Sequence, residues 1–367
     1  MKNPIETILI TGARAPIALE LARSFYNHGH KVIMADSQHL TIARWSNSVA
    51  KYFVIFSPRH NTNLFIKDIQ RIIQNEHVTH FIPTCEEAIY VSAHKDNFKC
   101  KVWTCDKDLI LSLHNKFSFS NYNNNPFPVP KTSLASDFRD WENSLQYVFK
   151  PCYSRFASSV IIHKKIDSQY FKEEDKEKWI AQNKIDGLEI CTYSIWDHGQ
   201  LKAYAAYHPL FKAGKGAGVY FEPIKNDLIY GYVKEIGKHI QYTGQLCFDV
   251  IIDKFQIPYF IECNPRGTSG AHLIGDQLAE AFLGNSTYIY EDKQEFSIKY
   301  AMAILHFKSF FKKRVRNSKD IIFRSNDLKP FFLQIFSLIE ITFLKLTKRI
   351  SWLEATTGDI EWNSDEM

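Results

Sequence analysis

The order of apolar and polar positions at the start of the chain predicts a parallel sheet with helices between its strands. Residues 7–11 form an apolar run, residues 17–27 repeat apolar side chains at helical spacing, and residues 31–36 form a second apolar run that ends in an acid. This succession is typical of a Rossmann-type βαβ unit. Another strand is predicted at residues 78–83. We therefore expect an N-terminal Rossmann-like domain over residues 1–110.

Further along the chain the pattern changes to hairpins. A polar loop rich in asparagine and proline, residues 121–130, separates the two regions. The later apolar runs predict strands at residues 147–151, 160–162, 188–196 and 201–207, a helix at 228–242 and an acidic hairpin at 248–264. The overall prediction is an α/β domain, then an α+β domain with two subdomains over residues 111–298, then a mostly helical C-terminal region over residues 299–367.

The acidic hairpin places oxygen-bearing side chains between apolar neighbours. If residues 254–257 form its turn, antiparallel pairing places Asp249 opposite Glu262 and Cys247 opposite Asn264. Because side chains alternate, Asp249, Glu262 and Asn264 then share one face. Two facing carboxylates in a half-buried sheet repel each other unless a divalent cation lies between them. The hairpin therefore predicts a Mg²⁺ site, with Mn²⁺ as a second option.

Arg266 continues the same face of the hairpin and would bring a planar cation toward an anion held by the metal. Phosphate is the anion that this combination suggests. The alternative is that the acids lie on a solvated surface of the hairpin. The Phe, Val, Ile and Tyr residues within 248–261 are typical of buried sheet, and they favour the metal site.

Composition restricts the class of protein. A chain of 367 residues with 45% hydrophobic and 23% charged residues is expected to fold into two or three domains. Its net charge of +5 gives no reason to expect a nucleic-acid partner. The seven cysteines have no CxxC spacing, which disfavours a zinc site and a disulfide framework and fits the reducing cytoplasm. The first residues do not have the pattern of an export signal.

Aromatic and basic residues gather in the C-terminal region. We find no apolar run of the roughly 18 residues that a membrane span needs. The nearest is residues 331–344, which Gln334 and Glu340 interrupt. Such a stripe is most often part of a core, which is our expectation. The alternative is a surface over residues 305–346 that contacts anionic lipid or another protein.

Several polar residues follow one another in a characteristic order. Lys116 and Lys150 precede Gln182, then Glu189 follows a glycine, and the acidic hairpin comes last. Over about residues 5–285 this order resembles the ATP-grasp superfamily, and within it the carboxylate-amine ligases and the large chain of carbamoyl-phosphate synthase. The resemblance implies a Rossmann-like domain followed by two subdomains that hold ATP between them. It also implies that ATP converts a carboxylate to an acyl-phosphate, which a nucleophile then attacks.

The resemblance also implies roles for individual residues. Lys116 and Lys150 correspond to lysines that contact the nucleotide phosphates, and Arg266 with Lys150 would act on the transferred phosphate. The residues placed around adenine and ribose are Gln182, Asn183, Ile185 and Glu189. The magnesium ligands of the family correspond to Asp249, Glu262 and Asn264.

The loop at residues 152–159 departs from the family, in which the equivalent loop is commonly rich in glycine. It has no glycine at all. Ser158 and Ser159 can still donate hydrogen bonds to phosphate, and Arg155 could reach the acyl acceptor.

A second loop, residues 211–218, is basic and contains three glycines. It is either a lid that brings Lys212 and Lys215 to the substrate carboxylate or an ordinary hairpin turn. His272 and His208 are candidates for the base that accepts the proton of the amine.

We therefore expect a cytoplasmic ATP- and Mg²⁺-dependent carbon-nitrogen ligase that joins a small-molecule carboxylate, or carbonate, to an amine and releases ADP. One alternative is a degenerate ATP-binding module that regulates a partner, which the glycine-free loop suggests. Another is a nicotinamide-dependent oxidoreductase, suggested by Gly12 and Asp36, although the loop at residues 12–17 lacks the GxGxxG glycines.

Overall fold

The N-terminal sheet of the computed structural model is parallel and has five strands in the order β3-β2-β1-β4-β5. The structure describes residues 4–123, 125–154, 159–214 and 216–362. The strands of this sheet are β1 (Thr7–Thr11), β2 (Lys31–Asp36), β3 (Lys51–Val54), β4 (His80–Ile82) and β5 (Lys101–Val102), and its helices are α1 (Pro16–Asn27), α2 (Thr62–Glu76) and α3 (Glu87–Ser92). The expected βαβ opening is confirmed. The strand order reverses between β1 and β4, where open α/β sheets commonly bind ligands.

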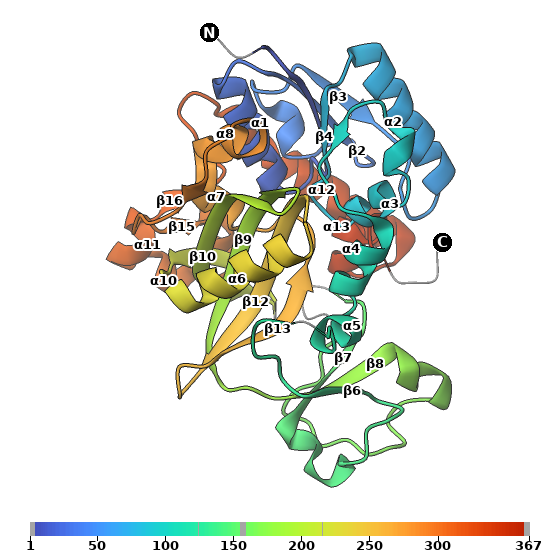
Figure 1. Ribbon diagram of the computed structural model, residues 1–367. Helices are drawn as coiled ribbons and strands as arrows, with labels where there is room; N and C mark the ends of the chain where they lie inside the picture. The colour runs from blue at the N-terminus through green and yellow to red at the C-terminus, as the bar shows by residue number, and fades with distance from the viewer. Residues whose placement is uncertain (1–3, 124, 155–158, 215, 363–367) are drawn as a thin grey trace.

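The second sheet is larger and runs in the order β13-β12-β9-β10-β11-β15-β16, with β14 paired to β10. Its strands are β9 (Gly187–Asp197), β10 (Gln200–Ala213), β11 (Ala217–Pro223), β12 (Gly244–Asp253), β13 (Pro258–Asn264), β14 (Tyr288–Ile289), β15 (Phe296–Ser297) and β16 (Lys319–Asp320). Helix α6 (Asp227–His239) covers one face, as Figure 1 shows. Residues of α1, α7 (Ala271–Ile274) and α8 (Leu278–Leu283) pack with alternate residues of β9 and β10 in a second core.

The smallest sheet is antiparallel, has the order β6-β8-β7, and lies at the bottom of Figure 1. Its strands are β6 (Thr132–Leu134), β7 (Tyr147–Pro151) and β8 (Trp179–Asn183). It has an aromatic core of its own, in which Phe138, Phe149 and Phe171 are buried. The expected strand at residues 160–162 does not form; of these three residues only Ile161 pairs, as one isolated bridge to Phe149.

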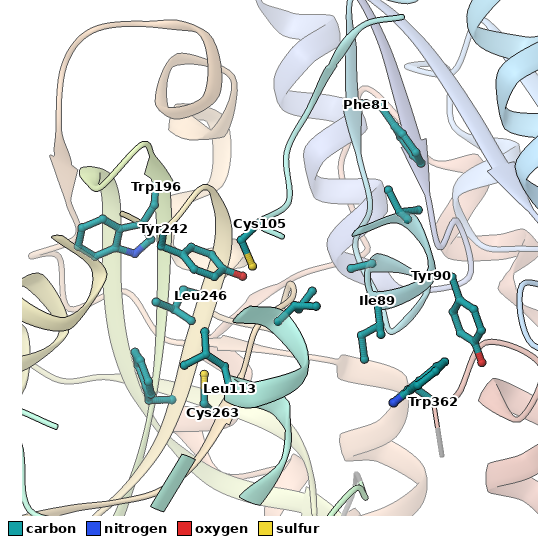
Figure 2. Packing of buried hydrophobic residues seen from close by; sticks show 14 of the residues in the cluster. Phe81, Ile89, Tyr90, Cys105, Leu113, Trp196, Tyr242, Leu246, Cys263 and Trp362 are labelled. Atoms are coloured by element: carbon teal, nitrogen blue, oxygen red, sulfur yellow. The ribbon is translucent and has the colours of Figure 1, made fainter. Parts of the chain in front are cut away.

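A buried cluster joins the N-terminal domain to the large sheet. Helices α4 (Lys107–His114) and α5 (Lys116–Ser120) connect the N-terminal sheet to β6. Figure 2 shows Cys105 and Leu113 beside Tyr242 and Leu246 of the large sheet's domain. In the same view Tyr90 of α3 meets Trp362, with ring centroids 5.3 Å apart. Trp362 thus packs against the N-terminal domain.

The C-terminal region is mostly helical, as expected. Its helices are α9 (Lys299–Leu305), α10 (Phe307–Phe310), α11 (Lys313–Asn317), α12 (Lys329–Lys348) and α13 (Trp352–Thr357). The expectation that the apolar stripe at residues 331–344 is core is wrong, since only 6% of the most apolar window of α12 is buried. By length and composition α12 could cross a membrane, although these two criteria are weak evidence by themselves.

Candidate active site

The pairing of β12 with β13 places the two acids as predicted. Asp249 lies opposite Glu262 and Cys247 opposite Asn264. Toward the turn the register changes, because Val250 pairs with Phe260 and Ile261 is an extra residue on β13. The prediction of one register for the whole hairpin is therefore correct at the acids and wrong between Glu262 and the turn. A β-bulge at this point lets the acids keep their pairing while the turn closes differently.

The side chain of Asp253 explains the closure of the turn. Its Oδ1 accepts hydrogen bonds from the backbone N–H groups of Phe255 and Ile257, both at 2.9 Å. The N–H of Asp253 in turn donates to the carbonyl of Ile257 at 3.0 Å. The strands are thus connected by residues 254–257, the loop that was predicted, and the bulge at Ile261 separates the register near the turn from the register at the acids.

The two facing acids have opposite electrostatic environments. Burial and the charge of Glu262 raise the pKa of Asp249. Burial acts on Glu262 in the same sense, but Lys116 and Lys150 outweigh it and lower its pKa. Asn264 donates from Nδ2 to Asp249 Oδ2 at 3.2 Å. Two half-buried carboxylates and an amide form a set of oxygen donors of the kind that Mg²⁺ prefers.

These residues fit a magnesium ion that shares its coordination with a nucleotide. Within the described ranges there is no group of three or more His, Cys, Asp and Glu side chains that could hold a metal by themselves. Mg²⁺ usually binds through one or two carboxylates, waters and substrate phosphates rather than in an all-protein cage. Asp249, Glu262 and Asn264 would supply the protein's share.

Two buried lysines converge on Glu262 from other parts of the chain. Lys116, at the start of α5, and Lys150, on β7, are each 4% exposed. Their Nζ atoms lie 3.7 and 3.9 Å from Glu262 Oε2. Lys150 also donates to the carbonyl of Ile261 at 3.2 Å, so the bulge residue helps to hold the lysine. Burial lowers the pKa of Lys150 to about 8, partly offset by Glu262.

The position of Lys116 follows from the way in which α5 begins. Asn115 Oδ1 accepts hydrogen bonds from the N–H groups of Phe117 at 2.9 Å and Ser118 at 3.1 Å, which is an N-cap. Lys116 Nζ then donates to the carbonyl of Ser154 at 2.7 Å. The lysine thus connects α5, the loop after β7 and the acidic hairpin.

Arg266 joins the hairpin to the N-terminal domain. Its Nη2 donates to Asn264 Oδ1 at 3.1 Å, and its Nε lies 3.8 Å from Glu86 Oε1. Glu86 directly precedes α3, at the carboxyl edge of β4. Glu86 is not among the residues predicted from the sequence. Its place after a strand next to the switch point was the signal that could have identified it.

A cavity of about 520 Å³ contains most of the predicted site residues. Residues of the N-terminal domain, including Ala15, Pro16 and Cys85, form one wall. The predicted residues that line it are Lys150, Gln182, Asn183, Ile185, Glu189, Lys212, Asp249, Glu262, Asn264, Arg266 and His272. A larger cavity of about 940 Å³ shares only His272 with these residues, and it lies away from the paired acids.

The segment between β8 and β9 joins the small sheet to the large one at this cavity. Gln182 is 3% exposed, and its Nε2 donates inward to Thr132 Oγ1 at 3.0 Å. Asn183 Oδ1 is buried and has no hydrogen-bond partner among the residues that the structure describes, while Ile185 lines the cavity. Gly187 is required where β9 begins, because a Cβ there would lie 2.0 Å from the carbonyl oxygen of Ile252.

The second predicted loop is a hairpin turn that covers part of the cavity. Strand β10 extends to Ala213 and β11 begins at Ala217. Residues 216–218 line the cavity, and Lys212 forms an ion pair with Glu189. The two interpretations of this segment, a lid and a hairpin turn, are compatible, since a hairpin turn can also cover a site.

The two candidate histidines have different settings. His272 is 2% exposed and its Nδ1 lies 3.0 Å from Glu20 Oε2. His208 Nδ1 donates to the carbonyl of Glu189 at 2.7 Å. Ser159 is exposed and does not line the cavity. Arg155, Ser158 and Lys215 lie outside the described residues.

Residues 356–359 contact the carboxyl edge of β1 and β2. Arg14 donates from Nε to Asp36 Oδ1 at 3.0 Å and from Nη1 to the carbonyl of Thr356 at 2.9 Å. Asp359 pairs with Arg14 and with Ser37. Asp36, which suggested a nicotinamide cofactor, is therefore held by the protein's own arginine, and this arrangement argues against that alternative.

Comparison with known proteins gives structural similarity only. No family model matches the chain, and no curated protein matches its sequence. Biotin carboxylase from Campylobacter jejuni, solved as a βγ-ATP complex, has a TM-score of 0.59 and 16% identity over 77% of this chain and 72% of that one.

Two further structures are similar over most of their length. N5-carboxyaminoimidazole synthetase from Staphylococcus aureus, complexed with ADP, has a TM-score of 0.64 and 14% identity, covering 84% of this chain and 86% of that one. L-amino acid ligase from Bacillus licheniformis has a TM-score of 0.56 and 15% identity, covering 78% and 76%. These enzymes are ATP-grasp proteins. The resemblance expected from the sequence is confirmed, and the chain has the ATP-grasp fold.

Proposed function

We propose that this protein is an ATP- and Mg²⁺-dependent ligase. It activates a small-molecule carboxylate, or carbonate, as an acyl-phosphate and joins it to an amine, with release of ADP and phosphate. The observation that carries the proposal is that the buried Lys116 and Lys150 both lie within 4 Å of Glu262. Glu262 in turn directly faces Asp249 in the hairpin. Negative and positive charge are concentrated in one cavity, which suits a metal-bound triphosphate.

The ligands of structural neighbours support ATP and magnesium as the cofactors. The biotin carboxylase domain of Hydrogenobacter thermophilus 2-oxoglutarate carboxylase, with a TM-score of 0.60, was solved with MgADP and bicarbonate. In this protein Asp249, Glu262 and Asn264 would hold the ion. When bound, Mg²⁺ neutralises charge on the phosphate oxygens.

The protein's own residues supply the remaining electrostatic stabilisation. Lys116 and Lys150 are positioned to neutralise the charge that spreads over the γ-phosphate oxygens as it is transferred. A carboxylate oxygen of the substrate attacks the γ-phosphorus, the bond to the bridging oxygen breaks, and ADP leaves. A carboxylate is ionised at neutral pH, so this step needs no base. Arg266 is close enough to Asn264 to steady the acyl-phosphate.

In the second step the amine attacks the acyl carbon, phosphate leaves, and the nitrogen loses a proton. His272 is the better placed of the two histidines to accept this proton, because it lines the cavity while Glu20 fixes its Nδ1 side. His208 uses its Nδ1 on a backbone carbonyl. Lys212 is positioned to reach a substrate carboxylate after release from Glu189.

The function can be tested by measuring ADP release from Mg²⁺-ATP in the presence of pools of amino acids and organic acids. We expect at least one pool to raise ADP release above the background, and Lys150→Met to abolish the increase. If ATP binds tightly in a Mg²⁺-dependent manner but no pool stimulates turnover, the degenerate ATP-binding module is the better description. If ATP does not bind at all, both readings fail.

One contact favours that second candidate. Glu189, which the family resemblance assigns to the ribose hydroxyls, is already paired with Lys212. A ribose at this position would have to displace the lysine or share the carboxylate with it. Lys212→Ala separates the candidates: the ligase loses turnover with its carboxylate substrate, whereas a module that only binds ATP keeps or gains nucleotide affinity.

A further inference from the structure

Helix α12 has the opposite orientation to that of an ordinary surface helix. Its polar residues face the body of the protein: Glu340 accepts hydrogen bonds from the N–H groups of His39 at 2.9 Å and Leu40 at 2.6 Å, and Ser337 Oγ donates to the carbonyl of Leu40. Its large apolar residues face outward, with Phe343 64% and Leu346 67% exposed. Soluble proteins normally bury the apolar side of such a helix.

The outward residues form a continuous stripe. Exposed apolar side chains occur at positions 332, 335, 339, 343 and 346, a spacing that places them on one side of an α-helix. The stripe is about 20 Å long at the rise of an α-helix. Trp352, at the start of α13, is also about half exposed, and Lys345 lies 5.1 Å from the centre of its ring. A contiguous apolar surface of this kind marks an interaction site.

The surrounding charge is strongly one-sided. Residues 299–350 contain twelve Lys and Arg but three Asp and Glu, a net charge of +9, whereas the rest of the chain carries −4. Lys345, Lys348 and Arg349 lie at the C-terminal end of the stripe. At its other end, Phe331 packs against Tyr300 of α9, with ring centroids 4.9 Å apart, so the basic segment of α9–α11 continues from the helix.

We infer that α12 is an in-plane membrane anchor that binds a bilayer surface rich in anionic lipids. An apolar stripe with lysines beside it and aromatic residues at its ends is the composition of an interfacial helix. The basic residues at the C-terminal end of the stripe repel a second copy of the same surface, whereas acidic headgroups attract them.

A transmembrane orientation does not fit the contacts of α12. The hydrogen bonds of Ser337 and Glu340 hold the middle of the helix against residues 39–40 of the N-terminal domain. A span through the bilayer would break them and expose the Glu340 carboxylate to lipid, which is costly. An in-plane helix keeps these contacts and buries only the outward stripe. Figure 1 shows α12 and α13 lying along the N-terminal domain.

The inference can be tested by sedimentation of the full chain with vesicles of phosphatidylcholine alone and of phosphatidylcholine mixed with an equal share of phosphatidylglycerol. We expect the protein to bind the acidic vesicles and to bind the neutral vesicles at least about tenfold more weakly. Raising the salt concentration should weaken the binding to acidic vesicles.

Matched variants separate the stripe from general stickiness. The double variant Ile339→Ser, Phe343→Ser should reduce affinity for acidic vesicles by about tenfold or more, because it removes two large apolar anchors. The double variant Lys345→Glu, Lys348→Glu should reduce the affinity for acidic vesicles by about fivefold or more for each position changed. Phe255→Ser is the control, since Phe255 is 70% exposed but lies on the turn between β12 and β13.

Correct folding of the variants is checked by their ATP affinity, which should match that of the unaltered protein because α12 lies outside the nucleotide cavity. The inference is overturned if the unaltered protein does not bind acidic vesicles, or if the stripe variant binds them as well as the control does. It is also overturned if light scattering shows a dimer that the stripe variant converts to a monomer, because a second copy then covers the helix.

Discussion

Replacing Asp249 with asparagine should stabilise the nucleotide-free protein and abolish its response to Mg²⁺. The change keeps the shape of the side chain and its ability to accept the hydrogen bond from Asn264. It removes one of two carboxylates that face each other in a buried sheet. Without a cation between them the two carboxylates repel each other. Asp249→Asn should therefore raise the stability of the nucleotide-free protein and lower its affinity for Mg²⁺.

The size of the effect follows from the geometry. Directly opposite residues in an antiparallel pair have Cβ atoms about 5 Å apart. Two unit charges at that distance repel by about 3 kcal/mol at an effective dielectric constant of about 20. Lys116 and Lys150 offset part of this cost, since both lie within 4 Å of Glu262. We expect a net gain of about 1 to 2 kcal/mol, or a rise in Tm of about 1 to 3 °C.

The gain should depend on pH. Burial and Glu262 raise the pKa of Asp249 to about 7, so the folded protein takes up a proton there before the unfolded chain does. Unaltered protein therefore loses stability as pH rises from the unfolded pKa of about 4 to this raised value. The advantage of Asp249→Asn should therefore grow as pH rises from about 4 to about 7, be fully present at pH 8, and be nearly absent below about pH 4, where this carboxyl is neutral in both the folded and the unfolded chain.

The assay is thermal unfolding followed by circular dichroism in EDTA, then in Mg²⁺-ATP. Mg²⁺-ATP should raise the Tm of the unaltered protein and leave that of Asp249→Asn unchanged. Asp96→Asn, at an exposed position, serves as the control and should change stability by less than about 0.5 kcal/mol. A lower Tm for Asp249→Asn in EDTA at pH 8, or an undiminished response to Mg²⁺-ATP, refutes the reasoning.

Three further predictions concern other positions. Gly187→Ala should destabilise the protein by about 2 to 4 kcal/mol, because the new Cβ would meet a carbonyl oxygen of β12. Gly231→Ala, at a position of helix α6 with open space around it, should stabilise the protein by up to about 1 kcal/mol. Chemical denaturation measures both changes, and equal effects would contradict the close approach at Gly187. Lys150→Met should lower ATP affinity by about tenfold or more in calorimetry while the fold is retained, because the lysine is buried beside the acids, and unchanged affinity would remove it from the phosphate site. Asp359→Asn should lower the free energy of unfolding by about 1 to 3 kcal/mol near pH 7. Burial opposes ionisation of Asp359, but Arg14 holds its pKa at about 2, so the loss of stability should disappear as pH falls from about 4 toward 2. A loss of stability that does not change with pH would contradict this prediction.

The sequence was sufficient to predict the acidic hairpin because alternation of side chains determines which residues share a face. Asp249, Glu262 and Asn264 were placed correctly from spacing alone. The bulge at Ile261 was not predictable in the same way. It depends on how Asp253 closes the turn, and several turn geometries suit the same residues.

Long-range contacts were the part of the site that spacing could not reveal. Glu86 meets Arg266 across a separation of 180 residues, and Arg14 meets Asp359 only because residues 356–362 return to the first domain. Neither pair has a local signature. The sequence order of charged residues predicted a candidate site, but not that Glu86 of the N-terminal domain lies beside it.

The exposed stripe of α12 was misread as core for a related reason. Periodicity shows that a helix has an apolar side, but not whether that side faces inward. Here Ser337 and Glu340 find backbone partners in the N-terminal domain, which turns the apolar side outward. Glu340, which interrupts the apolar run, lies on the side of α12 that contacts the N-terminal domain.

The most direct test of the proposed active site is a crystal structure with a non-hydrolysable ATP analogue and Mn²⁺, with anomalous diffraction used to locate the metal. The account predicts an anomalous peak between the carboxylates of Asp249 and Glu262, with the triphosphate beside Lys116 and Lys150. A nucleotide bound in the cavity with the metal peak elsewhere, or with no metal at these two acids, would contradict it.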